Sequence, residues 1–150
     1  MNEELIRYVK EINQAEYDTN VMLTLEYAAL VDETITDKQL IVLGMVHEHG
    51  RLNTGEIADK MGITPSAVSQ FLGKLEKAGY IKRSINPSNR REIIVELDSR
   101  GTEYMARNEQ IERSIIERYY SKLGLDDILT LRKIVLKLKA IVEEEQAKGD

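Results

Sequence analysis

The sequence predicts a mainly α-helical (α+β) fold in which a compact middle segment lies between long helices. Residues 2–30, about 99–122 and about 126–147 carry apolar side chains at near-helical spacing, as long amphipathic helices do. Between them, residues 36–79 divide into three short helices, and residues 80–97 form two alternating runs around a turn-rich tip. Helix, helix-turn-helix and hairpin in this order predict a winged helix-turn-helix with a two-stranded wing.

Capping residues mark the starts of the three short helices. Thr36 is followed three residues later by Gln39, which is the spacing of a capping box. Asn53 and Glu56 repeat this spacing at the second helix. The third helix begins at Thr64–Pro65, a capping hydroxyl followed by proline at the first helical position. Three glycines are expected to end these helices: Gly50, Gly62 and Gly79.

The hairpin is predicted from alternation between apolar and polar residues. The two strands are expected at Tyr80–Ile85 and Arg91–Leu97, and Asn86–Arg90 is expected to form a loop between them. The elements then divide the chain into N-terminal helix 1–35, winged helix-turn-helix 36–98 and C-terminal helices 99–150.

The flanking helices are expected to join two copies of the chain. Their apolar stripes have no evident partner within a chain of 150 residues, so we expect them to pack on each other and on a second copy. The alternative is that they fold back over a single monomer. The stretch Val31–Ile35 interrupts the helical pattern and is expected to separate the first helix from the winged domain.

Basic residues are concentrated in the segment that covers the third helix and the hairpin. Residues 64–92 hold six basic side chains against two acidic ones, although the whole chain carries a net charge of −5. A basic island in an acidic chain is typical of a module that binds duplex DNA in a groove.

The third helix has one apolar face and one short, polar face. Its apolar side chains follow i, i+4, i+7 spacing and should face the core: Val68, Leu72 and Leu75. The opposite face is expected to enter a major groove, where Gln70 would pair with an adenine edge. Thr64 at the helix N-terminus suits a phosphate or base contact. The proposed base- and phosphate-contacting set on this helix is Thr64, Ser66, Ser69, Gln70 and Lys74. The alternative is an ordinary amphipathic helix with a solvated face.

Four basic residues lie on the predicted hairpin. Arg90 and Arg91 are next to its Pro/Asn/Ser tip, and Lys82 and Arg83 are on the adjoining strand. Exposed arginine on a thin loop favours the minor groove, where the potential is most negative. The alternative is a charged hairpin that only meets solvent.

Several of these stretches together resemble the MarR family of bacterial and archaeal transcription regulators. The matching residues are Thr36–Gln39, Gly55–Ala58, Gly62–Ser69, Leu75–Ile81, Arg83, Asn89–Arg91 and Leu97–Gly101. The resemblance implies a triangular homodimer that binds a pseudo-palindromic operator and usually represses. It also implies that Arg91 is the minor-groove arginine of the wing. The family usually has aspartate two residues before that arginine, where this chain has Asn89, so the rigidity of the wing is in question.

The resemblance further implies an effector pocket where the long helices meet the winged domain. Relatives often accept phenolic or other aromatic anions there. Candidates by position are Met22, Tyr27, Met45, His47 and Tyr104. The alternative is that these side chains fill the core or the dimer interface.

Other classes of function are excluded by what the sequence lacks. The chain has no cysteine, so a disulfide framework, a thiolate metal site and a thiol redox switch are absent. His47 and His49 are two positions apart on a predicted helix and cannot share a metal ion. No phosphate-binding loop, dinucleotide fingerprint or activated nucleophile is present, so we expect neither a cofactor nor an enzyme.

The address predicted from the sequence is the cytoplasm. No apolar run approaches the roughly 18 residues of a membrane span, and the acidic start Met1–Glu4 lacks the apolar core of a signal peptide. The sequence therefore favours a homodimeric regulator that binds double-stranded DNA. The alternative is a winged-helix module that binds proteins and not DNA.

Overall fold

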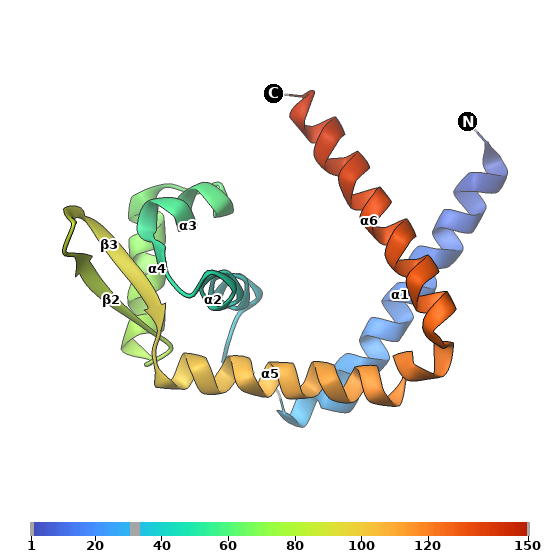
Figure 1. Cartoon of the computed structure of the whole chain (residues 1–150), viewed down its shortest axis with the longest axis horizontal. Helices are drawn as coiled ribbons and strands as arrows, with labels where there is room; N and C mark the ends of the chain where they lie inside the picture. The colour runs from blue at the N-terminus through green and yellow to red at the C-terminus, as the bar shows by residue number, and fades with distance from the viewer. Residues whose placement is uncertain (1, 31–33, 150) are drawn as a thin grey trace. The chain divides into compact units, whose positions relative to one another are not determined.

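The computed structural model describes residues 2–30 and 34–149 (Figure 1). Its elements in chain order are α1 (Glu3–Tyr27), η1 (Ala28–Leu30), α2 (Asp37–His49), β1 (Leu52–Asn53), α3 (Thr54–Met61), α4 (Pro65–Lys77), β2 (Ile81–Asn86), β3 (Asn89–Leu97), α5 (Ser99–Arg118), η2 (Tyr120–Leu123) and α6 (Leu125–Ala147). Two compact units result, Met1–Glu109 and Gln110–Asp150, with their boundary inside α5. The predicted mainly helical fold with a small antiparallel sheet is confirmed.

The predicted capping boxes are both present. At α2, the Gln39 backbone N–H donates to Thr36 Oγ1 (3.3 Å), and the Thr36 N–H donates to Gln39 Oε1 (2.9 Å). At α3, the Asn53 and Glu56 side chains accept from each other's backbone N–H groups at 2.8 Å. Each box satisfies two N–H groups that have no partner within the helix. Local sequence therefore fixes where these helices begin.

The chain reverses sharply at the end of α4. Gly79 has a φ of +80°, and its N–H donates to the Glu76 carbonyl at 3.0 Å. The next N–H, of Tyr80, donates to the Leu75 carbonyl at 3.0 Å. This pair of bonds is the Schellman motif, which needs a residue that tolerates the left-handed region. The turn sends β2 back alongside α4.

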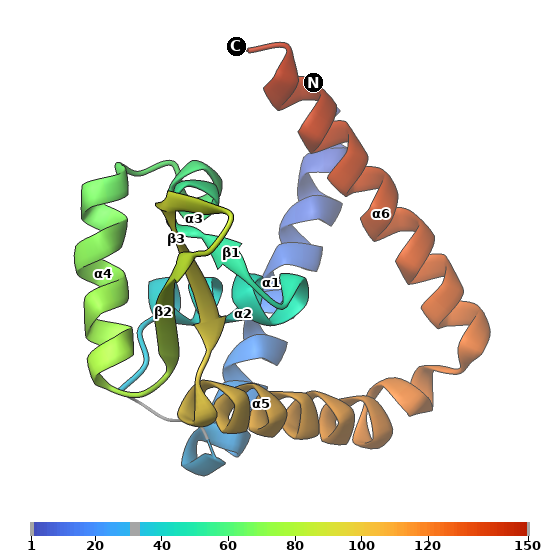
Figure 2. The same cartoon turned by 60° about the vertical axis from the view of Figure 1, so that its left-hand side comes forward.

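The sheet has three strands, in the order β1–β3–β2, and not the two that the sequence predicted (Figure 2). The additional strand β1 pairs antiparallel with β3 through Leu52↔Val95 and Asn53↔Ile94. A strand of two residues is too short to show alternation in the sequence. Asn53 is also the predicted cap of the next helix, and Leu52 directly precedes it.

The hairpin tip is tighter than predicted. Asn86 pairs with Asn89 across the two strands, so only Pro87 and Ser88 remain in the turn, and Arg90 belongs to β3. Asn86 Oδ1 accepts from the Ser88 N–H at 3.0 Å, an Asx turn that closes the tip. The expectation of a loop over Asn86–Arg90 was therefore wrong at both ends.

The core of the winged domain joins the three short helices to the sheet. The fully buried apolar side chains are Val42, Leu43 and Val46 of α2, Ile57 of α3, Val68, Leu72 and Leu75 of α4, and Ile81 and Val95 of the sheet. The predicted apolar face of α4 is thus confirmed. Because this stripe faces inward, the opposite face of α4 faces solvent.

The start of α5 is packed tightly against the turn that follows α4. A Cβ added at Gly101 would clash with the Tyr80 carbonyl oxygen, and the Asp98 N–H donates to that same oxygen at 3.0 Å. The helix then ends at Arg118 instead of about residue 122, because η2 and Gly124 (φ +80°) intervene before α6. The close approach at Gly101 fixes where the chain leaves the winged domain.

The long terminal helices contain no fully buried side chain. Neither α1 nor α6 contains a buried residue, although both carry apolar side chains. The expected long N-terminal helix is confirmed as α1 followed by η1, whereas most of the predicted break at Val31–Ile35 lies outside the described residues. Among the described residues, no helix is both long enough and apolar enough to cross a membrane.

Candidate nucleic-acid interface

The first half of α4 and the tip of the wing lie at the same end of the winged domain. Helix α4 runs away from this end, and β2 returns toward it, so the α4 N-terminus and the β2–β3 turn meet there (Figure 2). The arrangement follows from the Gly79 turn, which reverses the chain. Two differently shaped elements, a helix and a thin hairpin, are therefore presented together.

The outer face of α4 is polar and exposed, as the sequence predicted. Four polar residues of α4 are exposed and occupy helix positions outside the buried stripe: Ser66, Ser69, Gln70 and Lys74. Thr64 caps the helix by accepting the Ala67 N–H at 3.2 Å. Its hydroxyl proton remains free to donate to an acceptor in front of the helix. This face can therefore donate and accept hydrogen bonds without disturbing the fold.

The basic residues of the wing differ in how regular the strand is around them. Val95 is buried toward the helices and pairs with Arg83, so Arg83 is on the inner face of the sheet and Lys82 is on the outer face. The register of the two strands shifts after Ile85, next to the tip, so this alternation does not extend to Arg90 and Arg91. Both of these arginines are exposed beside the tip.

Amide hydrogen bonds hold the wing tip where the resemblance implies an aspartate. Asn89 Oδ1 accepts from the Arg91 N–H at 3.2 Å. Asn86 Nδ2 donates to Glu92 Oε2 at 2.9 Å across the two strands. These bonds order the backbone of the tip and leave the Arg91 side chain exposed. Asn89 therefore keeps a backbone-fixing role without carrying charge.

Arg83 faces Glu76 of α4 and is only partly exposed. Its Nε and Nη2 donate to Glu76 Oε2 (3.2 Å) and Oε1 (3.1 Å), and its backbone N–H donates to Oε2 (3.1 Å). The hydrogen bond from the Arg83 side chain is the main reason that the pKa of Glu76 lies below its usual value. Sequence reasoning missed Glu76, because nothing local pairs a helix residue with a strand residue seven positions later.

The five candidate effector-pocket residues have different surroundings. Met22 is exposed on α1, and Tyr27 is partly buried at the end of that helix. Met45 packs against the core. His47 Nε2 lies 2.7 Å from Glu109 Oε1 on α5. Tyr104 is buried, with its ring edge-on to Tyr80 at 6.0 Å between centroids.

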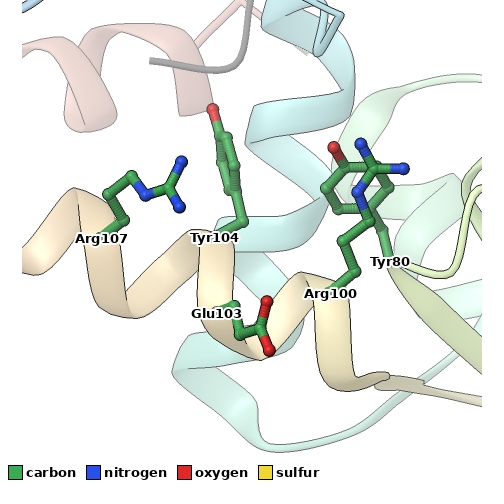
Figure 3. A pocket seen from close by; sticks show the side chains of 5 residues that line it. All are labelled: Tyr80, Arg100, Glu103, Tyr104 and Arg107. Carbon is green, nitrogen blue, oxygen red and sulfur yellow. The ribbon is translucent and has the colours of Figure 1, made fainter. Parts of the chain in front are cut away.

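A cavity of about 210 Å³ lies beside Tyr104 (Figure 3). It is lined by Tyr80, Arg100, Glu103, Tyr104 and Arg107. The guanidinium of Arg100 lies over the Tyr80 ring at 4.6 Å and donates to the Ala78 carbonyl at 3.2 Å. Sequence reasoning named only Tyr104 of this set. The lining residues on α5 follow i, i+3, i+4, i+7 spacing, which could have indicated a shared face: Arg100, Glu103, Tyr104 and Arg107.

The two histidines that raised the question of a metal ion have separate partners. His49 Nδ1 is 2.9 Å from the Met45 carbonyl oxygen on its own helix, and His47 is paired with Glu109. Within residues 2–30 and 34–149, no three His, Asp or Glu side chains are grouped so that they could hold a metal ion.

Comparison with known proteins identifies the family. The family model described as "MarR family" matches residues 35–93. The HTH-type transcriptional repressor MdtR of Bacillus subtilis is 32% identical over 112 residues, which cover 75% of this chain and 72% of MdtR. The chain belongs to the MarR family. This MarR-family chain is therefore a transcription regulator and not an enzyme, as its sequence predicted.

Solved structures have the same fold as this MarR-family chain. The YusO protein of Bacillus subtilis superposes with a TM-score of 0.68 at 29% identity, covering 93% of this chain and 97% of YusO. Streptococcus pneumoniae FabT, crystallised in complex with DNA, gives a TM-score of 0.77 at 17% identity and covers 93% and 98%. The winged helix-turn-helix with long terminal helices is thus the fold of the family.

We predict that the Glu76–Arg83 pair stabilises the fold at neutral pH and loses this effect in acid. Because the folded state lowers the pKa of Glu76, the stabilisation is complete above the usual value of 4.5 and is lost as the pH falls through the lowered value. The free energy of unfolding of wild type should exceed that of Glu76→Gln at pH 7, and the difference should shrink below pH 4.5.

Urea denaturation at fixed protein concentration between pH 7 and pH 3 measures this difference. Glu48→Gln, which removes another exposed carboxylate, is the charge-matched control. The prediction would be contradicted if the difference in the free energy of unfolding between wild type and Glu76→Gln stayed constant down to pH 3.

Proposed function

We propose that this chain is a repressor that binds a pseudo-palindromic DNA operator as a homodimer in the cytoplasm. One observation carries the proposal: the exposed polar face of α4 and the tip of the wing, which bears the exposed Arg91, lie at the same end of the winged domain (Figure 2). A helix with short polar side chains fits a major groove, and an arginine on a thin hairpin fits the adjacent minor groove. MdtR, a named repressor, and FabT, solved with DNA, support this assignment.

Each candidate contact has a distinct expected role. Gln70 would pair with adenine, and Ser66 and Ser69 would approach base edges from the first turns of α4. Thr64 and Lys74 suit phosphates on either side of the groove. On the wing, Arg91 would enter the minor groove. Lys82 and Arg90 suit the phosphate backbone, because Lys82 lies on the face of the sheet away from α4 and Arg90 is exposed beside the tip.

Selection of bound fragments from a random duplex library tests the proposal. We expect the selection to enrich an inverted repeat whose two half-sites, one per subunit, are about 34 Å apart. The affinity for the selected duplex should fall steeply with salt, because several phosphates are neutralised. The other candidate function, a module that binds proteins, is supported by the acidic remainder of the chain and predicts no enrichment and a flat salt response.

We predict that Arg91→Ala weakens operator binding by about 1–3 kcal/mol, roughly 5- to 150-fold. The loss comes from the minor groove, so it should be larger for operators with A·T pairs under the wing. Fluorescence anisotropy with the selected duplex measures the loss. Lys148→Ala is the matched control, because it removes one exposed cation at the far end of the chain. Equal affinity of Arg91→Ala and wild type would remove the wing from the mechanism.

The terminal helices support the homodimer. On α6, apolar residues that are 43–60% exposed form a stripe at helical spacing: Leu131, Ile134, Val135, Leu138, Ile141 and Val142. On α1, Leu5, Val9, Ile12, Val21 and Leu25 are exposed in the same way. Apolar surface of this extent is rare on monomeric proteins. Covering it with a second copy buries both stripes and spaces two winged domains for one operator.

We predict that Leu138→Glu shifts the dimer toward monomer. A carboxylate in the centre of an apolar interface loses hydration without gaining a partner. Light scattering after size-exclusion chromatography at micromolar concentration measures the mass. The adjacent Lys137→Gln, which also changes the net charge by −1, is the control for charge, and circular dichroism confirms that each variant keeps its helices. A wild-type protein with the mass of one chain would contradict the dimer itself.

The remaining part of the proposal is that a small aromatic anion releases the protein from DNA. The cavity beside Tyr104 supports this part, because it combines two aromatic rings with Arg107 and Arg100. A ligand that binds the folded protein raises its melting temperature. We predict that 4-hydroxybenzoate at millimolar concentration raises the melting temperature of wild type but not of Arg107→Ala. Arg113→Ala is the control, and a wild-type melting temperature that does not change would contradict the site.

A further inference from the structure

We propose that Glu76 and Arg83 form a clasp that fixes the recognition helix α4 relative to the wing, so that Arg83 is a positioning residue and not a DNA contact. The inference rests on the proposed function, because the positioning matters only if α4 and the wing bind DNA together. It also changes the role that the sequence gave Arg83, which was predicted to contact DNA like Lys82, Arg90 and Arg91.

The clasp joins the two elements by three hydrogen bonds on one carboxylate. Glu76 is in the last turns of α4, and Arg83 is the third residue of β2. Both carboxylate oxygens accept from the guanidinium, and one also accepts the Arg83 backbone N–H. Bidentate bonds between arginine and a carboxylate restrict orientation as well as distance. The backbone bond fixes the strand itself, so the clasp limits both sliding and rotation of β2 on α4.

The guanidinium also extends toward the DNA-facing half of α4. Its Nη1 lies 3.4 Å from the Ser69 carbonyl oxygen and 3.5 Å from Ser69 Oγ. Ser69, Gly73 and Glu76 follow i, i+4, i+7 spacing and so form one stripe on the helix. At Gly73 an added Cβ would be 3.8 Å from Arg83 Nη2. The absence of a side chain there lets the guanidinium lie along the helix surface for about two turns.

A guanidinium in this position is poorly suited to bind phosphate. Its charge is balanced by the Glu76 carboxylate, which is ionised at neutral pH and accepts both guanidinium bonds. The Arg83 side chain is 26% exposed, and its donors point at Glu76 and Ser69. A phosphate would have to compete with that carboxylate at short range. Arg90 and Arg91, in contrast, are exposed on β3.

The clasp matters because specific binding needs α4 and the wing in adjacent grooves at the same time. The bonds from Asn86 to Glu92 and from Arg91 to Asn89 hold the tip within the hairpin, and the Glu76–Arg83 pair lies between that tip and the Gly79 turn. If the hairpin could twist on α4, binding would have to order it at a cost to affinity. Non-specific binding through phosphates alone does not require this geometry.

Four variants of the full-length protein test the proposal: Glu76→Gln, Arg83→Gln, Arg83→Lys and the double variant Glu76→Gln/Arg83→Gln. The probes are the selected operator duplex and a random duplex of equal length. Each substitution should weaken operator binding about tenfold and leave random-duplex binding within about twofold, because the clasp orders the site without touching phosphate. The double variant should lose no more than either single variant, since all remove one interaction.

Two of these variants distinguish a positioning role of Arg83 from a direct contact between Arg83 and DNA phosphate. Glu76→Gln removes an anion near DNA, so it would strengthen binding if electrostatics alone mattered, whereas loss of the clasp weakens it. Arg83→Lys keeps the charge but not the bidentate geometry, so a phosphate contact would survive and the clasp would not. The slope of log affinity against log salt should not change for Arg83→Gln, whereas loss of one phosphate contact lowers its magnitude by about 0.9.

The outcomes are distinguishable. Unchanged random-duplex binding shows that a variant is folded, and Lys148→Gln controls for charge. The clasp is overturned if Glu76→Gln binds the operator as tightly as wild type or more tightly. It is also overturned if Arg83→Lys keeps full operator affinity, or if Arg83→Gln lowers the magnitude of the salt slope by about 0.9. A wild-type protein that binds no duplex would instead overturn the proposed function, and the inference with it.

Discussion

Burial of the apolar stripe on α4 is the constraint from which the interface follows. Val68, Leu72 and Leu75 are completely inaccessible to solvent, in one cluster with side chains from α2, α3 and the sheet. Removing one such side chain typically costs about 2–5 kcal/mol, so the helix has one stable rotation about its axis. The polar residues between the stripe positions are then directed outward. The same packing that stabilises the domain therefore selects the face that we propose to contact DNA.

The position of the wing depends on the points at which the chain leaves this core and returns to it. The left-handed Gly79 reverses the chain, and Gly101 lets α5 approach the Tyr80 carbonyl closely. Strand β1 pairs with β3 on the side away from β2, so β3 is held on both edges near its C-terminal half. Beyond that point the hairpin projects with no third strand. An anchored base with a projecting tip suits insertion into a groove, and it makes the orientation of the base important.

Charge and apolar surface are segregated in this chain. The net charge of −5 disfavours contact with a polyanion, yet residues 64–92 are basic and include the wing and α4. The acidic remainder opposes other orientations on the duplex, which directs association toward one surface. Exposed apolar side chains are concentrated on α1 and α6. The proposed DNA-binding surface and the proposed dimer interface therefore lie on different parts of the sequence.

By itself, the sequence determined the features that depend on neighbours within a few positions. The two capping boxes, the glycine stops and the buried face of α4 follow from contacts and periodicity within one helix and its caps, and the structure has all of them. Tertiary structure alone decided the features that join separate elements. The pairing of β1 with β3, the cavity beside Tyr104 and the pairing of Arg83 with Glu76 belong to this group. The physical reason is that a hydrogen bond between two elements depends on their relative orientation, which is set by packing of the whole core and not by local periodicity.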